Sequence, residues 1–126
     1  MSVSQLVRTT NRSMIAFDLL LGSGALAAPD LTLKAIGHDA PSPDARTLFQ
    51  RCGPIWLTYA AAHLLADRRG SSEDWAAVAW LRGTEILTDV VWASSPAIPR
   101  RRSRVLLRLA GAFNLALAVG AYRERR

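Results

Sequence analysis

Charged and titratable residues interrupt the apolar stretches of this 126-residue chain, and these are the residue types that do acid–base chemistry. Asp18 lies in an apolar stretch near the N-terminus, and His63 lies in the next one. Farther on, Glu85 and Asp89 follow Arg82 at the i, i+3, i+7 spacing that places side chains on one stripe of a helix. A carboxylate and a histidine held away from water can accept and return a proton, as in an isomerisation or a proton path. The candidates for that chemistry are Asp18, His63, Glu85 and Asp89.

The same residues have a structural interpretation, in which they form ion pairs that fix the register of packed helices. Three acids within or beside the apolar stretches are matched by three arginines. Because an unpaired charge in lipid is costly, this balance favours pairing. Depth along antiparallel helices places Asp18 level with Arg82, and it places Asp89 level with Arg108. We favour this interpretation over a catalytic one, and the residues predicted to pair are Asp18, Arg51, Arg82, Asp89 and Arg108.

No motif for a metal, a nucleotide or a nucleophile accompanies these residues. Cys52 is the one cysteine, which excludes an intramolecular disulfide and a multi-cysteine metal site. His38 makes no ligand pattern with His63. The glycines in residues 22–24 follow no strand and precede no Lys-Ser or Lys-Thr pair, so they indicate close helix packing rather than a phosphate loop. We therefore expect no cofactor and no metal.

The formal net charge of +6 has two interpretations, nucleic-acid binding or attraction to anionic lipid. The arginines decide between them, because they gather at the borders of the apolar stretches, as at Arg8 and Arg12 and in residues 100–104. Flanking anchors of membrane helices are placed in this way. The tryptophans are spread along the chain and form no stacking platform for bases. The expected partner is the lipid bilayer, and no nucleic acid is expected.

The elements that must position these residues are helices. Half of the residues are hydrophobic, and four apolar stretches stand out at 14–28, 52–66, 75–93 and 105–122. Their lengths approach the roughly 20 residues needed to cross a bilayer core, so each must borrow flanking turns. A chain of this length makes one domain. The sequence therefore predicts an all-α fold, a four-helix up-down-up-down transmembrane bundle that forms a single domain over residues 1–126.

Local signals mark the ends of these helices. Pro29 closes the first helix, and the short apolar stretch 31–36 that follows is expected to lie at an interface. Residues 42–43 supply a serine cap and a first-turn proline for the second helix, and Pro54 is expected to kink it. Residues 67–74 combine a basic end, a glycine and a capping box, so they predict a short connection between antiparallel second and third helices.

A membrane location is favoured over a soluble bundle. Between residues 54 and 66 the second stretch offers too few polar residues for a water-facing side. Residues 14–27 imitate a signal peptide, but Asp18 within them predicts that the segment is a retained first helix. The Arg- and Ala-rich usage fits a multi-pass protein of a bacterial inner membrane. The positive-inside count does not choose an orientation.

Two segments carry a resemblance to a known group. One is Trp80-Leu81-Arg82-Gly83-Thr84-Glu85 followed by Asp89 and Trp92, and the other is Leu109-Ala110-Gly111-Ala112-Phe113-Asn114. With them the chain resembles small bacterial four-helix membrane proteins, loosely the DoxX-like group, over about residues 14–122. The resemblance implies four membrane helices and carries over no catalytic residue. The dense charge within the apolar stretches is a departure from that group.

The expected function is that of a noncatalytic membrane protein. Such a protein is either an accessory subunit that packs against a larger membrane complex or a binder of a lipophilic molecule. The first alternative is a membrane-embedded enzyme that acts on an apolar substrate by acid–base chemistry, and the second is a soluble helical adaptor. The expected partners are the lipid bilayer together with a membrane protein or a lipophilic ligand.

Overall fold

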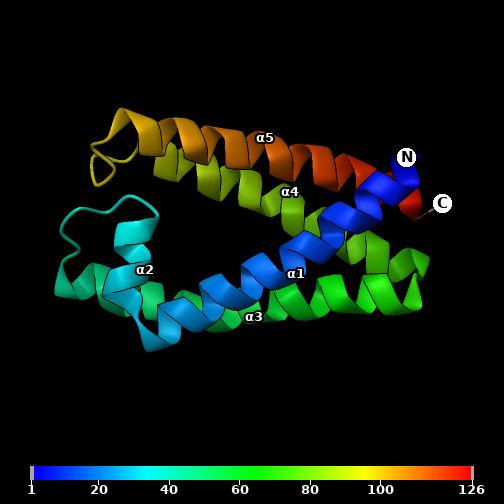
Figure 1. The fold of residues 1–126 in the computed structure, drawn as a ribbon, viewed down its shortest axis with the longest axis horizontal. Coiled ribbons are helices and arrows are strands. Elements are labelled where there is room, and N and C mark those ends of the chain that lie inside the picture. Colours follow the sequence, from blue (N-terminus) through cyan, green and yellow to red (C-terminus); the bar gives the residue numbers. More distant parts are fainter. Residues whose placement is uncertain (1, 126) are drawn as a thin grey trace.

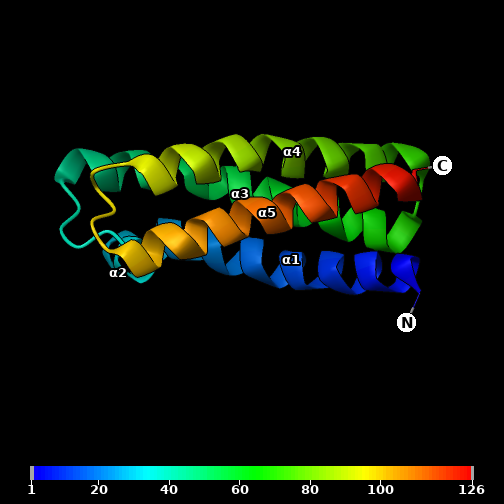
Figure 2. The same cartoon turned by 90° about the horizontal axis from the view of Figure 1, so that it is seen from above.

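Five helices make up the computed structural model, which describes residues 2–125 (Figure 1). They are α1 (Val3–Ala27), α2 (Pro29–Ala35), α3 (Pro43–Arg69), α4 (Ser72–Ser94) and α5 (Arg101–Glu124). The described residues form no strand, so the predicted all-α class is confirmed. The four long helices run antiparallel in chain order (Figure 1 and Figure 2). Both chain ends lie beside the α3–α4 connection, and α2 lies with the α4–α5 connection at the opposite end.

The helices taken singly support only part of the predicted transmembrane architecture. Within residues 2–125, α5 is the one helix that is long and apolar enough to cross a membrane, judged by length and composition. In α4 the charged residues Arg82, Glu85 and Asp89 interrupt the apolar sequence. This finding supports one membrane-spanning helix and not four. Whether the other long helices suit a membrane depends on the direction in which their charged side chains point.

The starts of α3 and α4 lie where the sequence predicted them, because a serine caps each helix. The Ser42 hydroxyl accepts a hydrogen bond from the backbone N–H of Ala45 at 3.1 Å, and a proline occupies the first turn of α3. Ser71 caps α4 in the same way through the N–H of Asp74, also at 3.1 Å. Between the two helices Gly70 takes a left-handed conformation, with a φ of 65°, that ends α3.

The stretch predicted to lie at an interface forms the short helix α2, which packs on α1 and α3. Pro29 lies in its first turn, so the chain turns between Ala27 and this proline instead of continuing α1. Leu33 of α2 faces inward and joins a buried apolar cluster with Trp56. Gly24 permits the close approach of the two segments, because a Cβ added there would lie 2.6 Å from the Thr32 Oγ1.

Two helix pairs compose the molecule, since α1 packs mainly on α3 and α4 mainly on α5 (Figure 1). α1 and α3 cross at Gly22 and Gly53, where a Cβ added to Gly22 would lie 2.9 Å from the Gly53 carbonyl oxygen. α3 then continues through Pro54 as one helix. In the second pair Gly111 of α5 lies against Asp89 of α4. The two pairs meet along smaller contacts, α3 with α4 and α1 with α5.

The interior has two apolar layers with a polar layer between them. Toward the chain ends, Trp75 and Leu117 belong to one buried apolar cluster. Toward α2, Phe49 and Trp56 belong to the other. On α3, His63 comes between the two clusters. The buried polar side chains of the described residues are Asn11, Asp18, His63, Arg82, Asp89 and Asn114.

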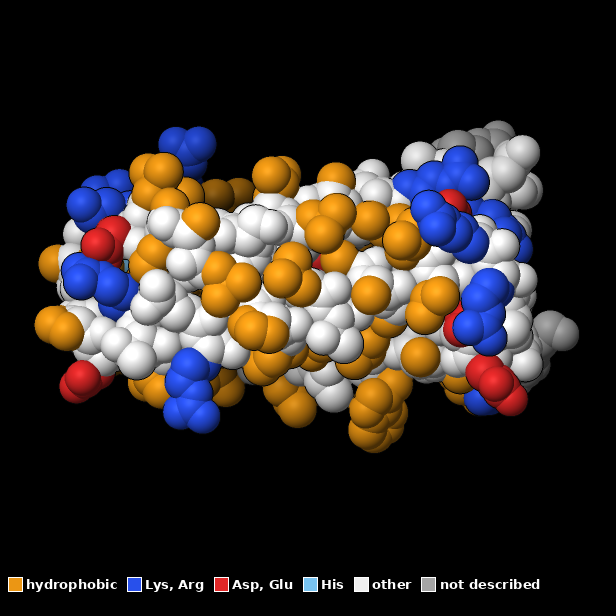
Figure 3. Space-filling model, turned by 90° about the horizontal axis from the view of Figure 1, so that it is seen from below, with side chains coloured by type: hydrophobic (Ala, Val, Ile, Leu, Met, Phe, Trp, Pro, Cys, Tyr) orange, Lys and Arg blue, Asp and Glu red, His pale blue; other side chains and the backbone are white. Residues whose placement is uncertain are grey.

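The outer surface is apolar over the middle of the molecule. Large apolar side chains are exposed on all four long helices, among them Leu20, Ile55, Leu87 and Leu109. Figure 3 shows hydrophobic side chains along the middle of one face, with charged side chains gathered toward the two ends. Over the middle of the molecule, buried polar side chains therefore lie between the two apolar clusters, while large apolar side chains lie outside, which is unusual in a water-soluble protein.

Gly22→Ala is expected to destabilise the crossing of α1 and α3. Its Cβ would press on a backbone oxygen, which cannot move aside as a side chain can, and such overpacking costs about 1–3 kcal/mol. Gly83→Ala is the matched control, because nothing lies within 4 Å of a Cβ there and alanine favours the helix by about 1 kcal/mol. Thermal melts should give a lower Tm for Gly22→Ala and an equal or higher one for Gly83→Ala. Equal stability of the two variants would contradict the close crossing.

Candidate functional site

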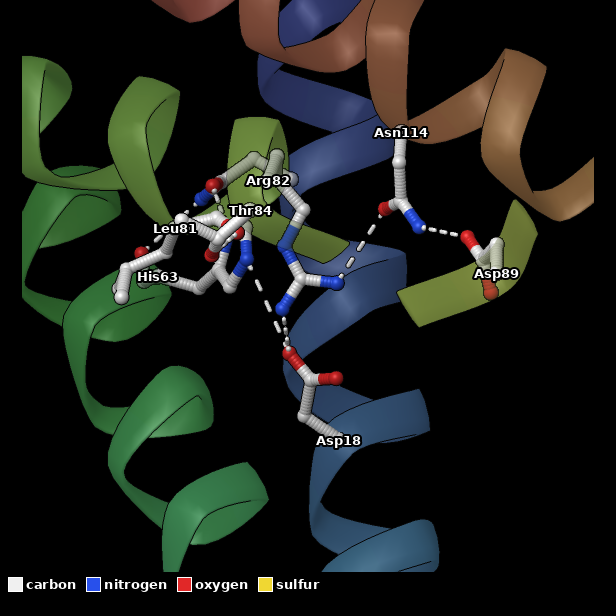
Figure 4. Close-up of polar contacts among 8 residues, drawn as sticks. Asp18, His63, Leu81, Arg82, Thr84, Asp89 and Asn114 are labelled. Carbon is white, nitrogen blue, oxygen red and sulfur yellow. Dashed lines mark hydrogen bonds and ion pairs between the residues drawn. The ribbon is translucent and has the colours of Figure 1, made fainter. Parts of the chain in front are cut away.

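An ion pair between Asp18 of α1 and Arg82 of α4 lies at the centre of the polar layer (Figure 4). Arg82 Nη2 donates to Asp18 Oδ2 at 2.8 Å, and the two side chains are only 2% and 1% exposed. The Arg82 guanidinium also lies over the Tyr59 ring, 5.0 Å from its centre. Sequence reasoning placed Asp18 level with Arg82, and the structure brings them together. The pair joins the α1–α3 half of the molecule to the α4–α5 half.

Asn114 of α5 connects this ion pair to Asp89. Its Oδ1 accepts a long hydrogen bond of 3.4 Å from Arg82 Nη1, and its Nδ2 donates to Asp89 Oδ2 at 2.8 Å (Figure 4). Gly111 brings the helices close enough for this contact, since a Cβ on it would lie 3.3 Å from the Cβ of Asp89. The hydrogen bond to Asn114 partly satisfies Asp89, which has no ion pair with an arginine among residues 2–125.

The predicted pairing of Asp89 with Arg108 and Arg51 is wrong. Both arginines are exposed, and neither forms an ion pair with a described residue. Arg108 comes six residues before Asn114, which turns it about a third of a turn away around α5. Arg51 lies two residues from Phe49, on the side of α3 that faces away from the interior. The number of residues from the start of a helix predicted how far along the helix each arginine lies. It did not predict the direction in which the side chain points.

His63 of α3 is held by Asn11 of α1, a residue that sequence reasoning missed. Asn11 Nδ2 donates to the His63 carbonyl oxygen at 2.9 Å, so its Oδ1 is left to accept from His63 Nδ1. In the neutral ring the proton is therefore on Nδ1. Nε2 then faces Asp18 Oδ2 at 3.7 Å (Figure 4). Asn11 could have been found, because Asn11, Met14 and Asp18 repeat the i, i+3, i+7 spacing of the α4 residues.

Glu85 lies at the edge of the polar layer and is half-buried. The Arg82 guanidinium and the polar side-chain groups of Tyr59 and Trp56 on α3 act electrostatically on its carboxyl group. Glu85 therefore extends the polar layer toward α3. With Asp18 and Asp89 it makes three carboxyl groups in the layer, against the single guanidinium of Arg82.

Two of the candidate catalytic residues lie out of reach of a substrate. Asp18 and His63 are fully buried, and neither lines a surface cavity among those described. Asp18 Oδ1, His63 Nε2 and Arg82 Nε nevertheless have no hydrogen-bond partner among the described residues. In Figure 4 the free oxygen of Asp18 points away from His63, toward the side of Asn114 and Asp89. Asp18, His63 and Arg82 can hold charge and protons among themselves, and none of them lines a described cavity.

A groove between α1 and α5 reaches the edge of this cluster. It has a volume of about 590 Å³, and Asn114 belongs to its lining. Apart from Ser13, the remaining lining is apolar and aromatic and includes Phe17 of α1 with Leu109 and Phe113 of α5. Nearer the chain ends the two helices touch, with a Cβ on Gly120 falling 2.7 Å from the Val7 side chain. The groove is therefore a mostly apolar opening with one buried amide and the exposed Ser13 hydroxyl in its walls.

Outside the long helices, His38 in the α2–α3 connection makes a separate contact with α4. Its Nε2 accepts a hydrogen bond from Trp92 Nε1 at 2.9 Å. Burial lowers the pKa of His38 below its usual value, which keeps Nε2 unprotonated and able to accept. No three described His, Cys, Asp or Glu residues are grouped to hold a metal ion.

No protein-family model, curated protein or solved structure matches this chain.

Arg82→Met is expected to destabilise the protein by about 3–5 kcal/mol, because it leaves the Asp18 carboxylate buried without a cation. The double variant Asp18→Leu/Arg82→Met should recover most of that loss, since it removes both charges. Arg12→Met is the control at the exposed pair with Asp67, where the expected change is at most about 1 kcal/mol. Denaturant titrations of the two single variants and the double variant give the free energies of unfolding for a double-mutant cycle. Additive losses at Asp18 and Arg82 would contradict the direct pairing.

Proposed function

We propose that this chain is a multi-pass integral membrane protein that binds a lipophilic molecule in the groove between α1 and α5, without catalysis. The observation that carries the proposal is the reversed distribution of polar and apolar side chains. Arg82 and Asp18 are among the most deeply buried side chains, whereas large apolar residues cover the outside. In water such a surface promotes association, whereas in a bilayer it faces a solvent of its own polarity.

The charges of α4 support this proposal once their direction is considered. Arg82, Glu85 and Asp89 lower the hydropathy of the helix, but they point into the bundle. The opposite side of α4 presents Trp80 and Leu87, which are 74% and 70% exposed. Intramembrane charges that face the bundle interior and find partners there are tolerated in membrane proteins. The hydropathy of a single helix therefore understates how well the assembled helices suit lipid.

The dimensions and the ends of the molecule also suit a bilayer. α4, with 23 residues, and α3, with 27, are about 35–40 Å long at 1.5 Å per residue, enough to cross a hydrocarbon core of about 30 Å. The exposed ion pairs lie near the helix ends. One end has Arg12–Asp67, Arg69–Asp74 and Arg8–Glu124, and the other has Arg46–Asp30 and Arg100–Asp39. Lipid headgroups and water would surround these charges.

The groove supports binding of a lipophilic molecule over a purely structural role. Its volume lies within the range of small-molecule sites, and its walls are mostly hydrophobic, with the exposed hydroxyl of Ser13 and one buried polar group. Asn114 can offer that group, because an amide has two N–H donors and two acceptor lone pairs, and it uses one of each kind within the cluster. A ligand can therefore be oriented without breaking the internal network.

The contact between His63 Nε2 and Asp18 favours one further function, acid–base catalysis on an apolar substrate. Catalysis would require the substrate to reach these atoms, yet both side chains are fully buried and neither lines the groove. Binding at Asn114 needs no such opening. For this reason we place the catalytic function second.

Leu87→Lys tests the membrane location. In a bilayer a lysine near the middle of a spanning helix costs about 2.5–3.5 kcal/mol, whereas on a water-exposed surface the change is close to neutral. The melting temperature in lipid bicelles should be lower for Leu87→Lys than for the control Leu87→Ala. A Leu87→Lys protein that equals Leu87→Ala in stability and dissolves without detergent would favour the soluble adaptor instead.

Ala110→Trp tests the groove, because Ala110 belongs to its lining and an indole there would fill it. Protein purified in mild detergent is extracted with organic solvent, and the bound molecules are measured by mass spectrometry. The wild type should carry a lipophilic molecule at near-equal molar amount, and Ala110→Trp should lose it. Ala112→Trp, exposed on the same helix outside the groove lining, should keep it. Equal amounts in all three proteins would exclude the groove as the site.

A further inference from the structure

The polar layer contains more acids than cations. Asp18, Glu85 and Asp89 share the guanidinium of Arg82, because the two other arginines expected there are exposed. A His63 ring that has its proton on Nδ1 alone adds no positive charge, and its Nε2 then faces Asp18. Two carboxyl groups are therefore left without a cationic partner in a poorly solvated interior, where charges interact more strongly than in water.

A ligand in the groove lies on the side of the polar layer where Asn114 and Asp89 are. Asn114 in its wall lies one hydrogen bond of 2.8 Å from Asp89 Oδ2. On the other side of the amide, Arg82 contributes only the 3.4 Å contact, and its guanidinium is already bound to Asp18 at 2.8 Å. The free oxygen of Asp18 also points toward the side of Asn114 and Asp89 (Figure 4). A ligand at Asn114 therefore lies one hydrogen bond away from a carboxyl group that has no ion pair with an arginine among the described residues.

The other walls suit the body of an organic cation. Phe17 and Phe113 both line the groove, one from each helix. Both rings are about half-exposed, 52% and 45%, and the face of an aromatic ring attracts a cation. Met14 adds a polarisable thioether, which adapts to irregular apolar shapes.

We propose that the groove between α1 and α5 binds a lipophilic organic cation. Its positive charge rests at Asn114 next to Asp89, and its apolar body packs between Phe17 and Phe113. An anion would be repelled by the unpaired carboxylates. A neutral ligand would leave the negative charge of these carboxylates without a partner. The inference rests on the proposed function, because it takes the same groove as the ligand site and adds the charge of the ligand.

Tetraphenylphosphonium and tetraphenylborate test the charge directly, because the two ions have nearly the same shape and opposite charge. Binding to the full chain is measured by equilibrium dialysis in a neutral detergent, with empty micelles as the blank. We expect the phosphonium ion to bind at least about 100-fold more tightly than the borate, given charges a few ångströms away in a medium of low polarity.

Variants locate the bound cation. Asp89→Asn keeps a side chain of the same shape and should weaken phosphonium binding by about tenfold or more. Phe17→Ala should weaken it through the lost aromatic wall. Glu73→Gln removes one acid from the exposed first turn of the same helix and should leave binding unchanged. Glu85→Gln replaces Asp89→Asn if the latter fails to fold by circular dichroism.

Three outcomes would overturn the inference. They are borate binding as tight as phosphonium binding, no phosphonium binding above the micelle blank, and a Glu73→Gln variant that weakens binding as much as Asp89→Asn. The second outcome would mean that protons alone neutralise the carboxyl groups. The proposed function fails separately, if Leu87→Lys shows no cost in bicelles or if Ala110→Trp retains the bound molecule. A chain that passes those two tests but does not prefer phosphonium keeps its function and loses only the charge assigned to the ligand.

Discussion

The ion pair between Asp18 and Arg82 is the contact on which the rest of the interior depends. Each helix pair packs through its own close contacts, at Gly22 with Gly53 and at Gly111 with Asp89. The two pairs share smaller apolar contacts, so the buried charges between them set how they align. A buried guanidinium without its carboxylate is costly, and few other alignments of the helices would bring the two groups within hydrogen-bond distance. The ion pair therefore selects one register for both halves.

Placing this polar layer inside leaves the outside of the molecule apolar. On α1 and α4 the polar residues of the layer take the inward side, and residues such as Leu20 and Leu87 take the outward one. The same geometry explains why α5 alone passes as a membrane helix by composition while the assembled surface is apolar over its middle. In a bilayer the polar layer would also favour a folded bundle, since separated helices would expose Arg82 and Asp18 to lipid. The alignment of the helices and the suitability of the outer surface for lipid thus depend on the same buried polar residues.

Much of the fold could be predicted from the sequence, because local signals determine it. Ser42 and Ser71 marked the helix starts, and the glycines indicated close packing. The helical nature of α2 was missed, because its seven residues are too few for a clear periodic pattern. Whether the chain belongs with DoxX-like proteins stays a prediction.

The candidate site was predicted in part. The pairing of Asp18 with Arg82 followed from depth along antiparallel helices, and that reasoning succeeded because both residues also face inward. It failed for Arg51 and Arg108, since depth says nothing of rotation about the helix axis. Asn11 was overlooked because it is uncharged, although its spacing from Asp18 contained the signal. The groove could not be predicted, because it depends on how α1 and α5 separate beyond the contact of Val7 with Gly120.

The measurement that tests the central claim most directly is the extraction of the expressed chain from membranes. Membranes are washed with high salt and then with alkaline carbonate, and the pellet and supernatant are compared before and after detergent is added. A chain whose apolar outer surface faces lipid stays in the pellet through both washes and is released only by detergent. Release by salt or carbonate would contradict the account, because it would mean that the apolar surface is covered by something other than a bilayer.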